Sequence, residues 1–204
     1  MKKYLFLVFI SIIVISCQKE SYDNEFEGDV VLFEKEYINY AWGYQHFGWI
    51  MDTAGIIKGF DQPGNWNFVD SLGCITGNDM AENLQKSGNT LFSVNTGEVK
   101  SFYPKAFESV YGKYTEPKSE MADFGTIVYS AYIYNQENRK FKRIVLYQYG
   151  DVSFTNTSEA AKQICSWMKN LESKIETERS SMFIPETKSI IYPKNLPTPR
   201  YSSR

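Results

Sequence analysis

Hydrophobic and polar positions alternate most regularly between residues 38 and 44 of the chain. Large side chains occupy every second position there, and small or polar side chains lie between them. A period of two residues is that of a β-strand, so this stretch predicts a strand with one aromatic face. The large side chains then change parity, which predicts a bulge or bend near His46 to Gly48. The large residues are Ile38, Tyr40, Trp42 and Tyr44, followed by Phe47, Trp49 and Met51.

Further strands are predicted where β-branched and aromatic residues cluster between turn signals. Asp52-Thr53-Ala54-Gly55 suits a tight turn with glycine in the left-handed region, so the runs on its two sides predict a hairpin. Residues 135–138 separate two longer runs, which predict a second antiparallel pair. These strands cover residues 30–33, 48–51, 56–60, 126–134 and 140–149.

Helix signals separate and follow the two hairpins. A short helix is predicted over residues 79–87, with Asn78 as its cap. Asn95 and Glu98 resemble a capping box for a second helix, in which Pro104 predicts a kink or a division into two short helices.

The third predicted helix, residues 158–175, has apolar side chains at helical spacing. Hairpins separated by helices predict the α+β class, with an antiparallel sheet built from hairpins and packed by helices in a single domain. This domain is expected over residues 30–182, between an acidic tether (17–29) and a proline-containing tail (183–204).

The first sixteen residues have the layout of a secretory signal peptide. Lys2 and Lys3 precede a run without charge from Leu5 to Ser16. A permanent membrane-spanning helix needs about 20 apolar residues, and this run is shorter.

Val14-Ile15-Ser16-Cys17 resembles the lipobox of bacterial lipoproteins, in which an aliphatic residue and a small residue precede an invariant cysteine. The resemblance implies cleavage before Cys17, attachment of a diacylglycerol to its thiol and acylation of its new amino group. Two or three acyl chains hold a water-soluble domain stably at a bilayer, so the membrane is an expected partner through this lipid.

The residue after Cys17 is Gln18, so the aspartate that usually retains lipoproteins in the inner membrane is absent. Outer-membrane placement in the cell envelope is therefore predicted. Lys19, Glu20 and the acidic residues that follow are similar to the surface-export signal of some Gram-negative lipoproteins. They equally suit a solvated tether, so the surface and periplasmic leaflets both stay open.

Charge argues against nucleic acid as a partner. Without residues 1–16, which hold Lys2 and Lys3, the 204-residue chain keeps 188 residues, 20 of its 22 basic residues and all 24 acidic ones. The resulting net charge of −4 follows from 20 minus 24 and lacks the basic excess that nucleic-acid binding needs.

Cys74 and Cys165 leave two alternatives. The envelope can be oxidising, which permits a disulfide between them. The position of Cys165 on the apolar stripe of the third helix favours two buried thiols instead. The sequence has no Cys-x-x-Cys pair, and neither a metal nor a cofactor is expected.

No motif of a known catalytic site occurs in the sequence, and no catalytic residue is assigned. The single histidine, His46, could act as a general base, but the sequence near it offers no nucleophile and no orienting partner. The aromatic stretch around it is the better candidate for function. If exposed, its rings would form a platform for sugar rings or peptide side chains, and if buried they would be the core of the sheet. The candidate binding residues are Tyr40, Trp42, Tyr44, His46 and Trp49.

Two hypotheses of function follow from these features. The first is a membrane-anchored envelope lipoprotein without catalytic activity, a binding or accessory protein that contacts a glycan, a peptide or an envelope protein. The alternative is a small envelope hydrolase with an unrecognised carboxylate or His46 site, which predicts two carboxyl groups close together or a pocket containing His46.

Overall fold

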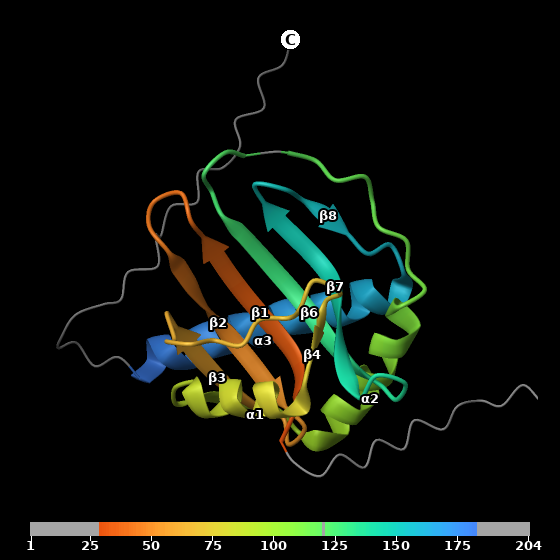
Figure 1. The fold of residues 1–204 in the computed structure, drawn as a ribbon. Helices are drawn as coiled ribbons and strands as arrows, with labels where there is room; N and C mark the ends of the chain where they lie inside the picture. Colours follow the sequence, from red (N-terminus) through yellow and green to blue (C-terminus); the bar gives the residue numbers. More distant parts are fainter. Residues whose placement is uncertain (1–28, 120, 183–204) are drawn as a thin grey trace, which may run out of the picture.

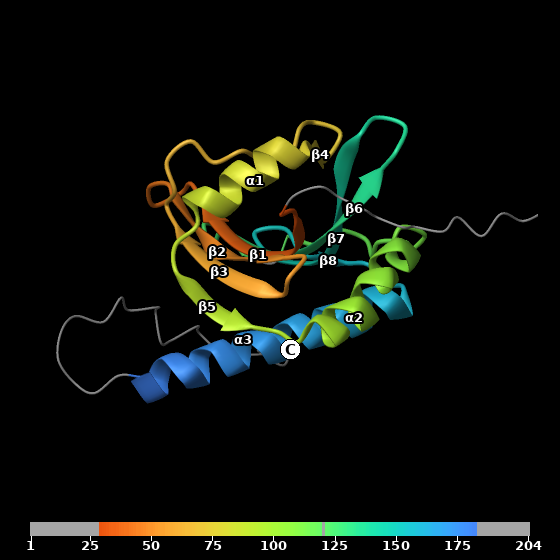
Figure 2. The same cartoon turned by 90° about the horizontal axis from the view of Figure 1, so that it is seen from below.

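The computed structural model describes residues 29–119 and 121–182 as one α+β body. Its eight strands form a single antiparallel sheet that curls. Helix α1 (Gly77–Lys86) lies on the concave face, and α2 (Thr96–Ser109) and α3 (Glu159–Met182) lie on the convex face (Figure 1 and Figure 2). This arrangement confirms the predicted fold class. The predicted signal peptide, lipobox and tail lie outside the described residues, as does all of the tether except Asp29.

The sheet has the strand order β4-β7-β6-β1-β2-β3-β5, with β8 paired to β7. The first strand of the chain therefore lies at the centre of the sheet and is hydrogen-bonded on both sides. The strands are β1 (Val31–Asn39), β2 (Gln45–Asp52), β3 (Ile56–Asp61), β4 (Cys74–Ile75), β5 (Thr90–Ser93), β6 (Thr126–Asn135), β7 (Lys140–Gly150) and β8 (Phe154–Thr155).

Side chains of β1 alternate between two different layers, as the pleat of a strand requires. Phe33 faces the convex layer, where its ring meets the ring of Trp167 in α3 at 5.0 Å between centroids. Lys35 faces the same way and pairs with Glu172 of α3 at 3.1 Å. Glu34 and Glu36, on the opposite parity, face the concave layer.

The convex layer is held by an aromatic stack between its two helices. Trp167 of α3 stacks on Phe102 of α2, with 4.4 Å between ring centroids and 6° between the planes. The Trp167 indole Nε1 also donates a hydrogen bond to Glu98 of α2 at 2.6 Å. Glu98 therefore joins the two helices, and the N-cap role is left to Asn95, whose side chain accepts from the Gly97 N–H at 2.8 Å.

The concave layer combines α1 with the segment between β3 and β4, residues 62–73. Asn83 of α1 fastens that segment, because its side chain accepts from Asn67 N at 3.0 Å and donates to Asn67 O at 2.8 Å. Trp66 is thereby buried against Phe60 of β3, with 4.5 Å between the ring centroids. No helix of residues 29–119 or 121–182 is long and apolar enough to cross a membrane.

Most predicted elements are confirmed with small shifts. Both hairpins form, and Gly55 takes the predicted left-handed conformation with φ of 81°. The cap of α1 is Thr76 rather than Asn78, since its side chain accepts from Asp79 N at 3.1 Å. The predicted division at Pro104 is wrong, because α2 continues through it. The carbonyl that loses its partner there belongs to the exposed residue Lys100 and can bind water.

The strand predicted over residues 38–44 is wrong in its second half. Strand β1 ends at Asn39, and residues 40–44 form the connection to β2. The bulge predicted at His46 to Gly48 is also absent. Strand β2 begins at Gln45 and pairs with β1 through Gly48 without a shift in register. The change of parity in the sequence is instead explained by the reversal of the chain between the two strands.

Gly48 marks a close approach of two backbones at the centre of the sheet. It pairs with Glu36 of β1, and a Cβ atom at this position would overlap the carbonyl oxygen of Lys35. We expect Gly48→Ala to lower the free energy of unfolding by about 1–3 kcal/mol, because β1 is held on both sides and cannot move away. Urea unfolding measures the change. The control is Gly64→Ala, where an added Cβ meets no atom within 4 Å; equal stabilities for the two variants would contradict the close approach.

Candidate functional site

The connection between β1 and β2 carries three exposed aromatic side chains. Tyr40, Trp42 and Tyr44 are 69%, 76% and 44% exposed. The rings of Tyr40 and Tyr44 lie 5.5 Å apart between centroids. The connection therefore ends the hairpin in a group of large rings that the core of the protein does not use.

Asn39, the last residue of β1, holds this connection in place. It is 5% exposed, and its side-chain oxygen accepts from Ala41 N at 2.8 Å. Its amide donates to the Tyr37 hydroxyl at 3.0 Å and to the Asp123 carbonyl at 3.3 Å. Gly43 has a φ of 92°, a conformation that favours glycine and lets the chain turn back. The rings are thus carried on a turn that is already ordered.

Phe68 extends the exposed rings toward the concave face. Its ring lies 5.2 Å from that of His46, and Tyr44 lies 6.2 Å from the same imidazole. Phe68 is 50% exposed, whereas His46 is completely buried. We call Tyr40, Trp42, Tyr44 and Phe68 the aromatic patch. Its four rings come from two segments that meet over His46.

A cluster of buried charged and polar side chains lies on the concave face beside His46. Arg143 of β7 contacts the carboxylates of both Glu34 and Glu36, at 3.7 Å for Glu34 Oε2 and in a closer ion pair with Glu36 Oε1. Tyr132 of β6 donates its hydroxyl to Glu34 Oε2 at 2.5 Å. His46 Nε2 lies 3.2 Å from Glu36 Oε2. We call these five residues the buried charged cluster.

The two carboxyl groups of the buried charged cluster have very different affinities for a proton. Burial, reinforced by the negative charge of Glu36, raises the pKa of Glu34 from 4.5 to about 6. Burial would also raise the pKa of Glu36, but the charge of Arg143 and the hydrogen bonds from His46 and Arg143 outweigh it and lower that pKa to about 2. Glu36 is therefore ionised at neutral pH, and Glu34 is the group that resists ionisation.

His46 is oriented by Glu36. An ionised carboxylate can only accept hydrogen bonds, so the proton on the imidazole lies on Nε2 and is donated to Glu36. The other ring nitrogen, Nδ1, is buried and has no hydrogen-bond partner among residues 29–119 and 121–182. A carboxylate that orients a histidine is an arrangement used for general bases. Here four aromatic rings, those of Tyr44, Phe60, Trp66 and Phe68, lie around the imidazole.

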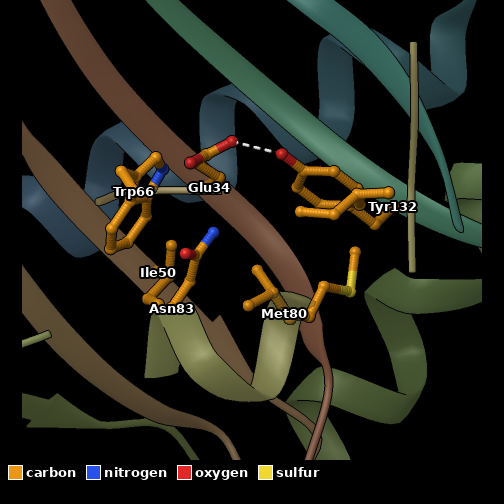
Figure 3. Close-up of a pocket in the computed structure, with 8 residues that line it drawn as sticks. Glu34, Ile50, Trp66, Met80, Asn83 and Tyr132 are labelled. Atoms are coloured by element: carbon orange, nitrogen blue, oxygen red, sulfur yellow. Dashed lines mark hydrogen bonds between the residues drawn. The ribbon is translucent and has the colours of Figure 1, made fainter. Parts of the chain in front are cut away.

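A cavity beside the buried charged cluster is too small for an organic substrate. It lies between α1 and the sheet, and Figure 3 shows Glu34 and Tyr132 on one side and Asn83 and Met80 of α1 on the other. Its volume is about 10 Å³, which is room for about one water molecule. His46 does not line it. The paired carboxyl groups that the hydrolase hypothesis predicts are present, but they are closed off from solvent.

The candidate residues from the sequence fall into two groups. Tyr40, Trp42 and Tyr44 are exposed together, as a platform requires. His46 and Trp49 are buried, and Trp49 lies on the opposite face of β2 from His46, with 4% of its surface exposed. The alternating pattern in the sequence placed these five residues in one group, but the chain reverses direction between β1 and β2 and puts the first three on the surface and the last two in the interior.

The two cysteines of the domain are free thiols, and both are buried. The disulfide considered between Cys74 and Cys165 is therefore not formed in this structure. Cys74 lies on β4 at one end of the sheet, and Cys165 lies on α3 in the convex layer. Cys17, the predicted site of lipid attachment, lies outside the described residues.

Sequence reasoning missed the buried charged cluster apart from His46. The sequence prediction placed the beginning of the first strand at residues 30–33 and gave Glu34 and Glu36 no role, because charged residues are rarely buried. Their spacing of two residues was the available signal, since residues two apart share one face of a strand. Their partner Arg143 is 107 positions from Glu36, and no local pattern joins them.

Comparisons with known proteins give no family and no activity. No protein-family model, no curated protein and no solved structure matches the chain. Within the described residues, no group of three or more His, Cys, Asp or Glu side chains is placed to hold a metal ion. Any function must therefore be argued from the aromatic patch and the buried charged cluster themselves.

The two glutamates should respond oppositely to neutralisation. At pH 8 we expect Glu36→Gln to lower the free energy of unfolding by about 3 kcal/mol, because it leaves Arg143 and His46 without their ionised partner. We expect Glu34→Gln to raise it by about 1–2 kcal/mol, because the amide still accepts from Tyr132 and removes a charge that burial disfavours. Urea unfolding of the two variants measures both changes.

The free energy of unfolding should depend on pH in opposite directions for the two glutamates. The stabilisation from Glu36 is present above its ordinary pKa of 4.5 and is lost as the pH falls toward about 2. The stabilisation from protonated Glu34 is present below 4.5 and is lost as the pH rises through about 6. Glu34→Gln should therefore abolish the loss of stability between pH 4.5 and pH 7. Similar destabilisation by both variants at pH 8 would contradict this assignment.

Proposed function

We propose that this chain is a lipid-anchored protein of the cell envelope that acts without catalysis, as a binding or accessory protein, and contacts its ligand through the aromatic patch. The observation that carries the proposal is the exposure of Trp42, 76%, on a turn that Asn39 holds in place. The anchor rests on the resemblance of Val14-Ile15-Ser16-Cys17 to a lipobox.

The energetics of exposed rings support contact with a ligand. Aromatic side chains bury about 150–250 Å² each in an interface, and tryptophan and tyrosine are enriched among the residues that dominate binding energy. Rings that are held in position before binding lose less conformational entropy when a ligand arrives. The hydrogen bonds of Asn39 supply this order for Tyr40, Trp42 and Tyr44.

The position of the patch suits a protein that is anchored at its N-terminal side. The described chain enters the fold next to Val31, and the patch begins directly after Asn39, at the other end of β1 (Figure 1). A strand of this length separates its two ends by about 25–30 Å. A tether attached at the start of β1 therefore leaves the aromatic patch on the far side of the domain, where a partner can reach it.

The buried charged cluster supports a structural role more than a catalytic one. Arg143 neutralises Glu36, and the cavity beside Glu34 has room for about one water molecule. General acid–base catalysis needs a substrate within hydrogen-bond reach of the acid and the base. The hydrolase alternative would require the segment carrying Phe68 to move away from His46.

Anchoring is tested by mass spectrometry of the protein purified from cell membranes. We expect the N-terminal residue to be Cys17, with the added mass of a diacylglycerol and an acyl chain, because the lipobox directs both modifications. Cys17→Ala should abolish the modification and leave residues 1–16 attached. An unmodified Cys17 thiol in membrane-derived protein would contradict the anchor.

The role of the patch is tested by Trp42→Ala. The fold should be unaffected, with a change in the free energy of unfolding of at most about 0.5 kcal/mol, since the side chain is mostly in solvent. Retention on cell-wall and polysaccharide resins should weaken by about 30-fold, which corresponds to about 2 kcal/mol for a dominant contact residue. Affinity chromatography and urea unfolding measure the two effects.

The matched control is Tyr111→Ala. Tyr111 is the most exposed aromatic residue of the described chain, at 86%, and it follows α2 rather than belonging to the patch. Its replacement should leave retention unchanged. Equal retention of wild type and Trp42→Ala, or unfolding of Trp42→Ala, would remove the support for the aromatic patch as the contact site.

A further inference from the structure

We propose that the ligand of the aromatic patch is an uncharged carbohydrate, a short stretch of a neutral glycan whose sugar rings stack on Tyr40, Trp42 and Tyr44. The inference rests on the proposed function and names the class of ligand. It is carried by the charge, the polar groups, the hydrogen-bonded edges and the area of the surface around the patch.

The surface around the patch is depleted of charge. Residues 37–51 and residues 62–69 contain no Asp, Glu, Lys or Arg, although 23% of the chain is charged. At that average, about five of these positions would carry a charge. The two segments meet at His46, where Gln62 N donates to the His46 carbonyl at 2.7 Å. A ligand that lies across both segments therefore meets residues that carry no charge themselves.

The charged side chains near the patch disfavour an anionic ligand. Lys86, which donates to the Asn65 carbonyl at 2.6 Å, is already paired with Glu82 at 3.1 Å. Asp61 pairs with Phe47 at the end of β3, and the backbone of Asp123 accepts the hydrogen bond from Asn39. Both side chains are exposed. Carboxylates at the base of the hairpin repel phosphates, uronic acids and other anions. Recognition of an anionic ligand usually employs Arg or Lys, which residues 37–51 and 62–69 lack.

Polar groups at the patch suit hydroxyl groups. Gln45 is half-buried at the start of β2 and Gln62 is exposed beside it in the fold. A primary amide donates and accepts hydrogen bonds through neighbouring atoms, and a tyrosine hydroxyl does both through one oxygen. A sugar hydroxyl also donates and accepts. The flat faces of the rings can meanwhile cover the C–H faces of a sugar, since aromatic side chains combine an apolar body with a polar tip.

An extended peptide is a poorer fit, because no strand edge is free at the patch. Strand β1 is paired with β2 and β6, and β2 is paired with β1 and β3. Peptides that bind sheets by strand addition need an unpaired edge whose N–H and C=O groups they can bond. At this hairpin a ligand meets side chains instead of open backbone groups.

A second copy of the chain is also a poorer fit, because the patch is small. Four rings of about 200 Å² each, exposed by 44–76%, offer about 500 Å². A stable protein–protein interface needs about 800 Å² from each partner. An area of about 500 Å² suits a ligand of a few sugar rings.

The test uses the fluorescence of the four tryptophans. Trp42 is 76% exposed, whereas Trp49, Trp66 and Trp167 are 4%, 9% and 5% exposed. Acrylamide in solution therefore quenches mainly Trp42. The lipidated protein, which begins at Cys17, is bound to phosphatidylcholine vesicles and titrated with neutral oligosaccharides: cello-, malto-, manno- and chitohexaose. Parallel titrations use polygalacturonate and heparin as anionic glycans and a casein digest as a source of peptides.

We expect at least one neutral hexasaccharide to abolish the quenching of Trp42, and the anionic glycans and peptides to leave it unchanged. Trp42→Phe should remove the quenchable signal, which verifies its source, and Gln62→Ala should weaken the protection by the sugar. Tyr111→Ala is the matched control and should behave as wild type.

The possible failures are distinguishable. Protection by the peptides, by the anionic glycans or by self-association at rising protein concentration, without protection by a neutral sugar, overturns the carbohydrate assignment and leaves the patch as a binding site. Absence of protection by every probe overturns the carbohydrate assignment, and the retention test with Trp42→Ala then decides the proposed function separately. Protection by a neutral sugar that is retained in Gln62→Ala and Tyr44→Ala alike overturns the placement of the ligand across the two uncharged segments.

Discussion

The structure depends on the burial of two glutamates against Arg143 inside the curled sheet. Glu34 and Glu36 lie on β1, which is the central strand, and they face the concave layer that α1 covers. Two unpaired carboxylates at this depth would each cost several kcal/mol of desolvation. Arg143 reaches them from β7, across β6, and makes their burial tolerable. A slip of β7 by one residue would turn Arg143 to the other face and leave both carboxylates uncompensated, so the cluster fixes the register of three strands.

This constraint also separates the two faces of the molecule by chemistry. The convex layer is an apolar and aromatic core in which Phe33 and Phe102 pack against Trp167. The concave layer has charges at its centre. The Tyr132 hydroxyl donates to Glu34, and the His46 imidazole bonds to Glu36, the carboxylate that Arg143 neutralises. Because this network is closed over by α1 and the segment through Trp66, it gives the fold a definite register and offers little to a substrate. The surface that does meet solvent with large side chains is the end of the β1–β2 hairpin.

Much of this fold could be predicted from the sequence because its signals are local. The turn at Gly55 and the long helix with Ile164, Met168 and Leu171 depend on residues only a few positions apart. The buried charged cluster could not be predicted in the same way, since Glu36 and Arg143 are 107 positions apart. A charged residue taken by itself predicts a position at the protein surface. The patch was predicted in part: Tyr40, Trp42 and Tyr44 were recognised as a group, but a regular alternation cannot show where a strand ends.

The different burial of Trp42 and Trp49 shows which of these aromatic residues the fold requires. Trp49 lies within β2 and is buried, as the core of a sheet demands. Trp42 lies in a connection that does not need it, because two antiparallel strands can be joined by as few as two residues, usually with Asn and Gly. This connection has five residues, 40–44, and three of them are large exposed rings. Exposed aromatic area promotes aggregation, and a Trp42 side chain that is 76% exposed adds little to the stability of the domain; this is the argument for the proposed contact between the hairpin and a ligand.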